Sequence, residues 1–337
     1  MVQKLSEREI IRFIRMSIPE KRCDLAKGIG DDCSVFGSAQ KGFWLITTDT
    51  LVDTIHFDRA FHQPHLLGRK CIAASLSDIA AMGGEPKFVL LSISLPSDMS
   101  TSWLTKWFDG VKEIVDEYNC CLIGGDTVQA KELSITVTIL GEQGPGGSIY
   151  RSGACENDTV YVSGFLGDSA AGLELLQKQP NNLKDNKWGE FIKAHLNPVP
   201  QVDLGKQLAL SGYVTSMQDI SDGLATDLSH ICYESGCGAI LSQISLPYHP
   251  LLADAAKVVD TDMLDLQLLG GEDYQLVFTV KENRGNQLES IIEEALNQAI
   301  YPVGRIKKGS GVSLQKTNGE LVEITFKGYE HTMEEIS

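Results

Sequence analysis

Long apolar runs are absent from this chain of 337 residues, and the longest, residues 88–95, ends at Pro96. A helix that spans a bilayer needs about 20 apolar residues, so the sequence predicts no membrane-spanning helix. The first residues are polar and charged, without the apolar core of a secretory signal. We therefore expect a cytoplasmic protein that does not bind membranes, with its eight cysteines reduced.

Common catalytic and metal-binding motifs are also missing. The cysteines form no C-x-x-C pair, and the chain lacks the P-loop, the nucleophile elbow and the H-E-x-x-H zinc motif. Gly28 and Gly30 begin a dinucleotide fingerprint, but Cys33 stands where its third glycine belongs. These absences exclude structural zinc sites and the best-known nucleotide loops.

Positive charge is scarce, because 29 Lys and Arg face 45 Asp and Glu, for a net charge of −16. A field of this sign repels phosphate backbones and anionic lipids. We therefore expect no nucleic-acid partner. A small phosphorylated ligand stays compatible with this charge if cations lie between the ligand and the protein.

The chain is long enough for about two domains at ~150 residues per domain. Strand and helix patterns are mixed without strict β-α-β order, which predicts an α+β fold with layered sheets and helices. Examples are strands over residues 43–48 and 120–123 and a helix over residues 66–82. A Gly/Pro-rich stretch over residues 141–147 places the domain boundary near residue 150, so we expect domains at 1–150 and 151–337. Residues 179–187 read as a polar loop or linker.

Five short segments place carboxylates beside glycine or at the end of an apolar run: residues 28–32, 47–50, 124–127, 219–223 and 270–273. Each alone is typical of a turn. Together they predict convergent metal binding, because hard cations such as Mg²⁺ take carboxylate and hydroxyl oxygens. Asp49 and Asp126 are expected just beyond strand ends.

Asp78 is a further carboxylate, placed on the expected helix among small neighbours that cannot neutralise it. A buried carboxylate needs a partner, or its pKa rises. A metal ion would be such a partner. Arg151 is the best candidate for a cation that contacts a phosphate oxygen. Metal-assisted phosphoryl transfer suits a site of this kind, because it needs positioning and charge neutralisation.

In this order, the segments resemble the thiamine-monophosphate kinase family of the aminoimidazole-ribonucleotide-synthetase-like superfamily. The resemblance extends from about residue 9 to residue 331. Its matching stretches are residues 28–33, 47–51, 56–57, 74–83, 123–127, 151–153, 167–173, 219–224, 270–274 and 327–329. It implies transfer of the ATP γ-phosphate to thiamine monophosphate, the last step of thiamine diphosphate synthesis. It also implies a two-domain fold whose N-terminal sheets close a barrel across a homodimer, beside an α/β layered C-terminal domain.

The resemblance also implies roles for particular residues. Ligands for several Mg²⁺ ions would be Asp32, Thr47, Thr48, Asp49, Asp78, Asp126, Asp219 and Asp222. Contacts to ATP would be Gly125, Asp126, Arg151 and Ser221. Contacts to the thiamine substrate would be His56, Glu272 and Phe326, the last at the position of an aromatic residue that stacks on thiamine.

No covalent or general-base residue is expected, because the acceptor is a phosphate oxygen that is already anionic near neutral pH. Two alternatives remain open. One is another ATP-dependent enzyme of the same superfamily, such as a ring-closing or selenophosphate synthetase. The other is a non-catalytic module that binds Mg-nucleotide and turns nothing over.

Overall fold

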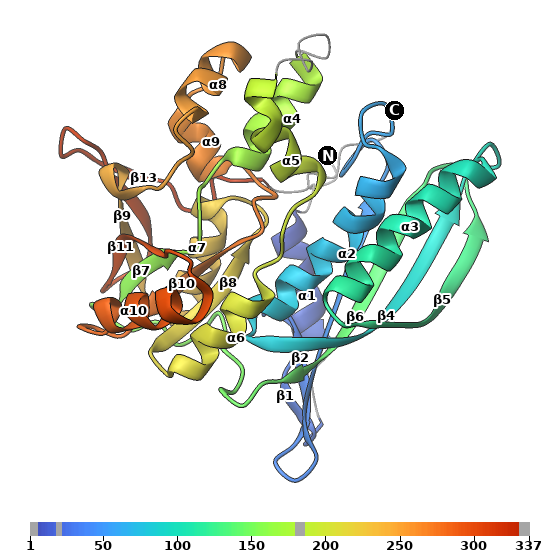
Figure 1. Ribbon diagram of the computed structural model, residues 1–337. Coiled ribbons are helices and arrows are strands. Elements are labelled where there is room, and N and C mark those ends of the chain that lie inside the picture. Colours follow the sequence, from blue (N-terminus) through green and yellow to red (C-terminus); the bar gives the residue numbers. More distant parts are fainter. Residues whose placement is uncertain (1–5, 18–21, 179–185, 330–337) are drawn as a thin grey trace.

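The computed structural model describes residues 6–17, 22–178 and 186–329. Its two mixed sheets, each packed with helices, confirm the α+β fold class (Figure 1). The first sheet has the order β1-β2-β3-β6-β4-β5. Its strands are β1 (Leu25–Lys27), β2 (Ser34–Ser38), β3 (Gly42–Val52), β4 (Gly84–Leu95), β5 (Cys121–Gln129) and β6 (Ser134–Gln143).

The second sheet has the order β13-β12-β9-β11-β7-β10-β8. Its strands are β7 (Thr159–Val162), β8 (Val214–Ile220), β9 (Gly238–Ser242), β10 (Gln275–Val280), β11 (Tyr301–Lys307), β12 (Gly311–Gln315) and β13 (Leu321–Glu323). All of them follow residue 150, whereas the strands of the first sheet all precede it. The pairs β4–β5 and β9–β12 are parallel, and the other named pairs are antiparallel.

Helix α2 (Pro64–Ala81) is the central helix of the molecule. It lies beside α3 (Thr101–Glu117) on one face of the first sheet (Figure 1). Most of its residues are buried, because the first sheet, α3 and elements of the second half surround it. The helices approach closely at Gly68 and Gly110: a Cβ there would lie 2.1 Å from the Trp107 carbonyl oxygen and 1.9 Å from that of His65.

One hydrophobic core joins the two halves. It contains α2 and the first sheet, and it continues into Leu208, Met217 and Phe278 of the second half. Strand side chains alternate between faces, so Val160 and Val277 point to the opposite side of the second sheet. There they form a second core with α7 (Leu224–Ser235). The shared core fixes the position of one half relative to the other.

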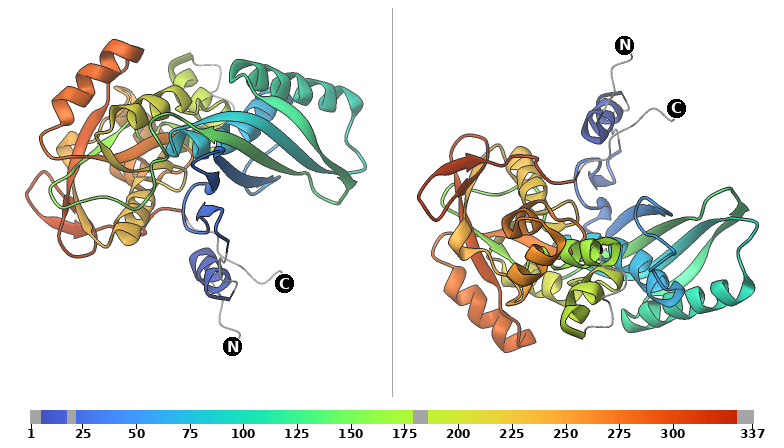
Figure 2. Two further views of the ribbon diagram at one scale, coloured as in Figure 1. Left: turned by 90° about the horizontal axis from the view of Figure 1, so that it is seen from below. Right: turned by 90° about the horizontal axis from the view of Figure 1, so that it is seen from above.

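The remaining helices cover the second half and the periphery. A third core lies among α4 (Asp168–Lys178), α5 (Gly189–Leu196), α8 (Leu252–Val259) and α9 (Met263–Leu269). The other elements are α1 (Glu7–Ser17), α6 (Val202–Ser211), α10 (Gly285–Leu296) and two short 3₁₀ helices, η1 (Asn186–Trp188) and η2 (Gln243–Ser245). Figure 2 shows α1 at the periphery, beside the body of the molecule. Across the described ranges, no helix has the length and apolarity to cross a bilayer.

Two expected strand ends are wrong. Strand β3 continues past Asp49 to Val52, because its pairing with β6 runs unbroken to that residue. Strand β5 likewise continues through Asp126 to Gln129 along β4. Ladder hydrogen bonds use the backbone, so the polar side chains do not end these strands. The expected helix over residues 66–82 is confirmed as α2, whereas residues 179–185 of the expected loop lie outside the described ranges.

Candidate functional site

A cavity of about 1340 Å³ is lined by residues from both halves of the chain. The first half contributes the loop before β2, strand β3 and the end of α2. The second half contributes Arg151, the end of β8 with the loop after it, and the loop before β10. This volume lies above the range of about 300–1,000 Å³ usual for one small ligand. The cavity therefore has room for two substrates.

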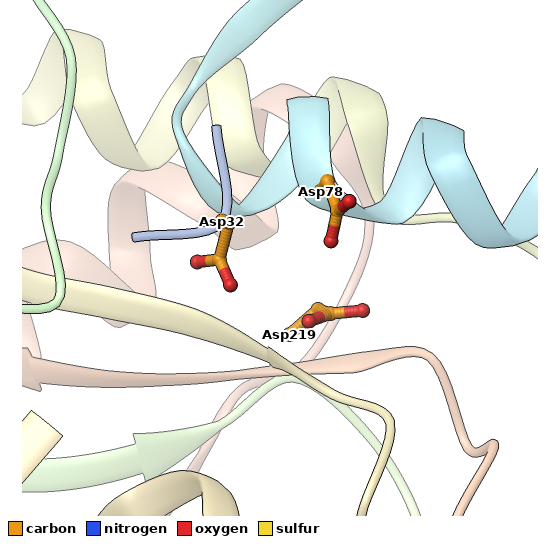
Figure 3. A group of neighbouring side chains, drawn as sticks. All are labelled: Asp32, Asp78 and Asp219. Atoms are coloured by element: carbon orange, nitrogen blue, oxygen red, sulfur yellow. The ribbon is translucent and has the colours of Figure 1, made fainter. Parts of the chain in front are cut away.

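Three carboxylates from separate elements converge in this cavity. Asp32 lies in the loop before β2, Asp78 in the last turn of α2, and Asp219 near the end of β8. One oxygen of each lies within 4.8 Å of the others, and Figure 3 shows the three side chains directed at one another. Asp32 and Asp219 are buried and Asp78 is partly buried. The structure thus brings together three of the residues predicted to bind metal.

The three carboxylates are electrostatically crowded. Burial raises the pKa of Asp32 to about 6, although the adjacent Arg151 guanidinium acts in the opposite direction. Burial also raises the pKa values of Asp78 and Asp219 well above the usual range for aspartate, and the surrounding carboxylates add to the effect. Like charges this close oppose ionisation unless a cation neutralises them.

The donor set fits a divalent cation. Asp32 Oδ1 accepts hydrogen bonds from Arg151 Nη2 at 2.6 Å and Nε at 3.1 Å. Asp32 Oδ2 is buried and has no hydrogen-bond partner among the described residues. A buried carboxylate oxygen without a partner costs free energy. A hard cation such as Mg²⁺ takes oxygen ligands of this type, so Asp32, Asp78 and Asp219 suit it as ligands.

Strand β3 presents three more of the predicted ligands to the cavity. The Thr47 hydroxyl donates to Asp78 Oδ2, and Ser75 on α2 donates to Asp49 Oδ2 at 2.7 Å. Thr48 lies on the opposite face of the strand, because strand residues alternate, and its hydroxyl is 2.9 Å from Thr138 Oγ1. Thr47 and Asp49 therefore face the carboxylates with their side chains, whereas Thr48 could contribute only its backbone there.

The loop after β8 brings Ser221 and Asp222 to the cavity. Asp227 in the first turn of α7 holds this loop, since its Oδ2 accepts the backbone N–H of Ser221 and of Asp222, both at 3.1 Å. Asp227 is fully buried, and its Oδ1 accepts from Gln218 Nε2 at 2.8 Å. Asp227 therefore sets the position of both predicted site residues.

Arg151 lines the cavity between acidic and aromatic groups. Besides its bonds to Asp32, its Nη1 lies 3.2 Å from His230 Nδ1. Burial lowers the pKa of Arg151, but Asp32, Asp31 and Asp227 together raise it, so that the net change is an increase. Arg151 therefore stays a cation within reach of a bound phosphate.

The predicted substrate contacts lie at two places. His56 and Glu272 line the main cavity, where His56 Nδ1 accepts the Val52 N–H at 3.1 Å. Phe326 lines a smaller hollow of about 50 Å³, which shares Asp222, His230 and Tyr329 with the main cavity. The Phe326 ring packs against His230 at 5.4 Å and under the Arg8 guanidinium at 4.0 Å.

Gly125 and Asp126 do not line this cavity in the single chain. Both lie within β5, the edge strand of the first sheet, and the side chains of that strand are exposed along its whole length. The structure therefore gathers the predicted residues around one cavity, except for Gly125, Asp126 and Phe326, the last of which lines the adjoining hollow. Their roles stay predictions.

Several residues of the site went unrecognised in the sequence. Asp31 accepts from Lys27 Nζ at 2.8 Å and from the Arg151 N–H at 3.1 Å, so it fixes Arg151. Asp227, Lys70 and His195 also support the site. For Lys70, the sequence signal is a lysine on the same face of the expected helix as Asp78.

Comparison with known proteins gives a consistent result. The family model "AIR synthase related protein, N-terminal domain" matches residues 30–143, and "AIR synthase related protein, C-terminal domain" matches residues 156–317. A thiamine-monophosphate kinase of Escherichia coli O157:H7 is 38% identical over 320 residues, which cover 93% of this chain and 94% of that protein. The Bacillus subtilis (strain 168) thiamine-monophosphate kinase is 35% identical, covering 90% of this chain and 93% of its own length.

A solved structure, AaThiL complexed with AMPPCP and TMP, matches with a TM-score of 0.85 and 31% identity. The match covers 98% of this chain and 99% of that one. Sequence and fold therefore agree along nearly the whole chain.

Proposed function

The chain belongs to the AIR synthase related family and, within it, to the thiamine-monophosphate kinases, and on this premise we propose that it transfers the ATP γ-phosphate to thiamine monophosphate. The products are thiamine diphosphate and ADP. The observation that carries this proposal is the convergence of Asp32, Asp78 and Asp219 beside Arg151 in a cavity with room for two ligands. The relatives support a kinase over another synthetase of the superfamily or a non-catalytic nucleotide-binding module.

The residues that would hold Mg²⁺ are Asp32, Asp78 and Asp219, with Thr47, Thr48, Asp49, Asp126 and Asp222 as further candidates. Bound Mg²⁺ supplies neutralisation of phosphate charge in such a site. The carboxylates in turn anchor the nucleotide end of the cavity. The unpartnered Asp32 Oδ2 supports this assignment.

The chain's own cation for the phosphates is Arg151, and Ser221 lies on the same cavity wall. Asp31 and Asp32 orient Arg151, so its guanidinium is held before substrate arrives. A held cation costs little reorganisation when charge develops. Gly125 and Asp126 are proposed as further ATP contacts.

No side chain has to remove a proton. The acceptor is a phosphate oxygen of thiamine monophosphate, which is anionic near neutral pH. Direct in-line transfer needs the two substrates held in register, and the shared core that joins the two halves provides a fixed frame for this. His56, Glu272 and Phe326 would hold the thiamine end. No covalent intermediate on the protein is proposed.

We propose that residues 1–150 carry the metal-binding and dimer-forming parts, and that residues 151–337 complete the ATP and thiamine phosphate site. Asp32 and Asp78 come from the first part, and Asp219, Ser221 and Glu272 come from the second. A cytoplasmic location stays a prediction, which the use of ATP supports.

A homodimer is also proposed. Strand β5 is an open sheet edge on which Leu122, Ile123 and Val128 are 41%, 54% and 48% exposed. Exposed edge strands with apolar side chains favour pairing with another chain. A second copy on this edge would cover them, and Gly125 and Asp126 would then face a cavity only across the interface. Closure of the two first sheets into a barrel belongs to the same proposal.

If β5 forms the dimer interface, a charged residue introduced on this strand should disrupt the dimer. Ile123→Lys should convert a dimer into a monomer, because a lysine cannot be buried unpaired at an apolar interface. Light scattering after gel filtration gives the mass, and Ser290→Lys on the exposed face of α10 is the matched control. A wild-type monomer, or an Ile123→Lys variant that stays dimeric, would contradict the proposal.

Product analysis tests the reaction itself. Purified protein is incubated with Mg-ATP and thiamine monophosphate, with free thiamine as a parallel acceptor, and the products are separated by chromatography. We expect equal amounts of thiamine diphosphate and ADP from the monophosphate alone. ATP binding without thiamine diphosphate, or ADP formation with no phosphorylated acceptor, would refute the proposal.

A further inference from the structure

Lys70 is a buried cation that the proposed reaction does not use. It lies on α2, and its side chain is 0% exposed. Lys70, Ala74 and Asp78 are four residues apart and share one face of the helix; Ala74 and Asp78 line the cavity. Burial of an ammonium group costs several kcal/mol, and an apolar side chain of similar size is often at least as stable. Packing alone therefore does not account for Lys70.

Lys70 reaches a single carboxylate, that of Glu272. Its Nζ lies 3.1 Å from Glu272 Oε2, and no other hydrogen-bond or ion-pair partner of Lys70 is found in the described part of the chain. His195 approaches the same oxygen, with Nδ1 at 3.4 Å from Oε2. Both contacts thus use one carboxylate oxygen. Glu272 Oε1 has no such contact within the described ranges, and it belongs to a side chain that lines the cavity and is 26% exposed.

His195 is nearly as deeply buried as Lys70. It is 2% exposed, and Ser169 Oγ lies 3.3 Å from its Nδ1. Burial, together with the nearby Lys70 charge, lowers its pKa well below the usual histidine range. His195 is therefore neutral, and Lys70 supplies the positive charge at Glu272.

The backbone of Glu272 is fixed from several sides. Its φ of +61° lies in the left-handed region, which is unfavourable for a residue with a side chain. The loop keeps this conformation because the Glu272 N–H donates to the Ser221 carbonyl at 2.8 Å and the Tyr274 N–H to the Ile220 carbonyl at 2.9 Å. Asp273 adds two bonds, accepting the N–H groups of Gly167 and Ser169 at 2.7 and 3.0 Å.

We propose that Lys70 and His195 are positioning residues that hold Glu272 Oε2, so that Oε1 faces the cavity and receives the cationic thiazolium or the amino group of the thiamine substrate. This inference rests on the proposed function and extends it by two residues. Lys70 interacts with Oε2 of the carboxylate, and the cationic group of the substrate interacts with Oε1. Loss of Lys70 should therefore weaken binding of the thiamine substrate and leave binding of ATP unchanged.

Lys70→Met tests the positioning role, because methionine fills the same space without charge. We expect the KM for thiamine monophosphate to rise at least about tenfold, as for loss of a charged hydrogen bond. The KM for ATP should change less than about twofold. Lys206→Met removes a surface pair with Asp203 and is the matched control, with all constants unchanged.

A double-substitution cycle separates positioning from general stabilisation. Glu272→Gln should raise the KM for thiamine monophosphate more than that for ATP. Added to it, Lys70→Met should cause little further change, because both act through one carboxylate. Full additivity, an unchanged KM in Lys70→Met, or equal increases for both substrates would overturn the proposal.

His195 gives a second route if Lys70→Met does not fold. His195→Leu removes the imidazole nitrogen that lies 3.4 Å from Glu272 Oε2 and should raise the KM for thiamine monophosphate, whereas His195→Gln keeps a polar N–H group there and should restore much of the binding. Equal behaviour of the two variants would overturn the role of His195. If the wild-type protein forms no thiamine diphosphate, the proposed function fails instead, so the two failures are distinguishable.

Discussion

Individual side chains at the site are arranged around charge. Asp32, Asp78 and Asp219 place oxygens within 4.8 Å of one another, with the Arg151 guanidinium bonded to one of them. Without metal, the crowding disfavours the ionised form of all three carboxylates, because burial raises their pKa values. A group of this kind is unfavourable as a structural feature and useful as a cation site.

Asp219→Asn separates the effect of the carboxylates on stability from their effect on catalysis. It removes one ionisable group from the crowded set and keeps the shape of the side chain, so the metal-free protein should melt at a higher temperature than wild type. The turnover number should fall by about 100-fold or more, because several kcal/mol of charge stabilisation are lost. Calorimetry without metal and a steady-state assay with Mg-ATP measure the two. A drop in both stability and activity would contradict the crowding argument.

Sequence reasoning at this scale found the carboxylates and missed their supports. Asp32 and Asp219 lie in short segments that contain glycine, and Asp78 lies in a helix among small neighbours, so their chemistry is visible from local sequence. Asp227 acts through the backbone N–H groups of a neighbouring loop, and Lys70 acts through Glu272, which lies 202 residues further along the chain. Local spacing carries no signal of such a contact, and only the tertiary structure reveals it.

Among the elements, α2 links packing to chemistry. It lies between the first sheet and the second half, and it carries Asp78 to the cavity, while its Lys70 and Ser75 contact the cavity residues Glu272 and Asp49. Its position depends on the close crossing with α3 at Gly68 and Gly110.

The apolar pattern of residues 66–82 predicted the helix, but the predicted lengths of strands β3 and β5 were too short. Their ends depend on the partner strand rather than on their own side chains.

Gly110→Ala tests the helix crossing. Its new Cβ would lie 1.9 Å from the His65 carbonyl oxygen, so α2 and α3 must move apart. We expect a loss of about 1–3 kcal/mol in the free energy of unfolding, as for an overpacked core. Asp109→Ala on the exposed side of α3 is the control and should change it by less than about 0.5 kcal/mol. Denaturant unfolding compares them; equal stability of the two variants would show that the crossing is not tight.

For the whole molecule, the raised pKa values couple folding to pH and to metal. The folded state holds protons on Asp32, Asp78 and Asp219 at pH values where the unfolded chain has released them. The contribution of these groups to metal-free stability is therefore lost as pH rises from about 4 through their folded values, about 6 for Asp32. His62 acts in the opposite sense, because burial lowers its pKa to about 3 and stability falls as acid protonates the unfolded chain.

Mg²⁺ should therefore stabilise the protein more at higher pH than at lower pH. Protons compete with the metal for the same oxygens, so the increase in Tm on adding Mg²⁺ should be larger at about pH 8 than at about pH 6. Differential scanning fluorimetry with and without Mg²⁺ gives this difference, and the histidine effect cancels in it. Asp219→Asn should lose most of the increase. A metal effect that is the same at both pH values would argue against binding at these carboxylates.

The fold as a whole was predictable in class but not in arrangement. Mixed strands and helices indicated α+β layers, whereas the shared core, with Met217 and Phe278 packed into the cluster around α2, follows from contacts that no local pattern encodes. That core gives the cavity two fixed walls. The account therefore depends on both halves acting on one pair of substrates.

The most direct test follows the transferred phosphate. ATP labelled with ³²P in its γ-phosphate is incubated with Mg²⁺ and thiamine monophosphate, and the label is traced by chromatography and by gel electrophoresis of the protein. The account predicts label in the terminal phosphate of thiamine diphosphate, none on the protein, and almost none with Asp219→Asn. Label on the protein before acceptor is added, or label only in inorganic phosphate, would contradict direct transfer at this site.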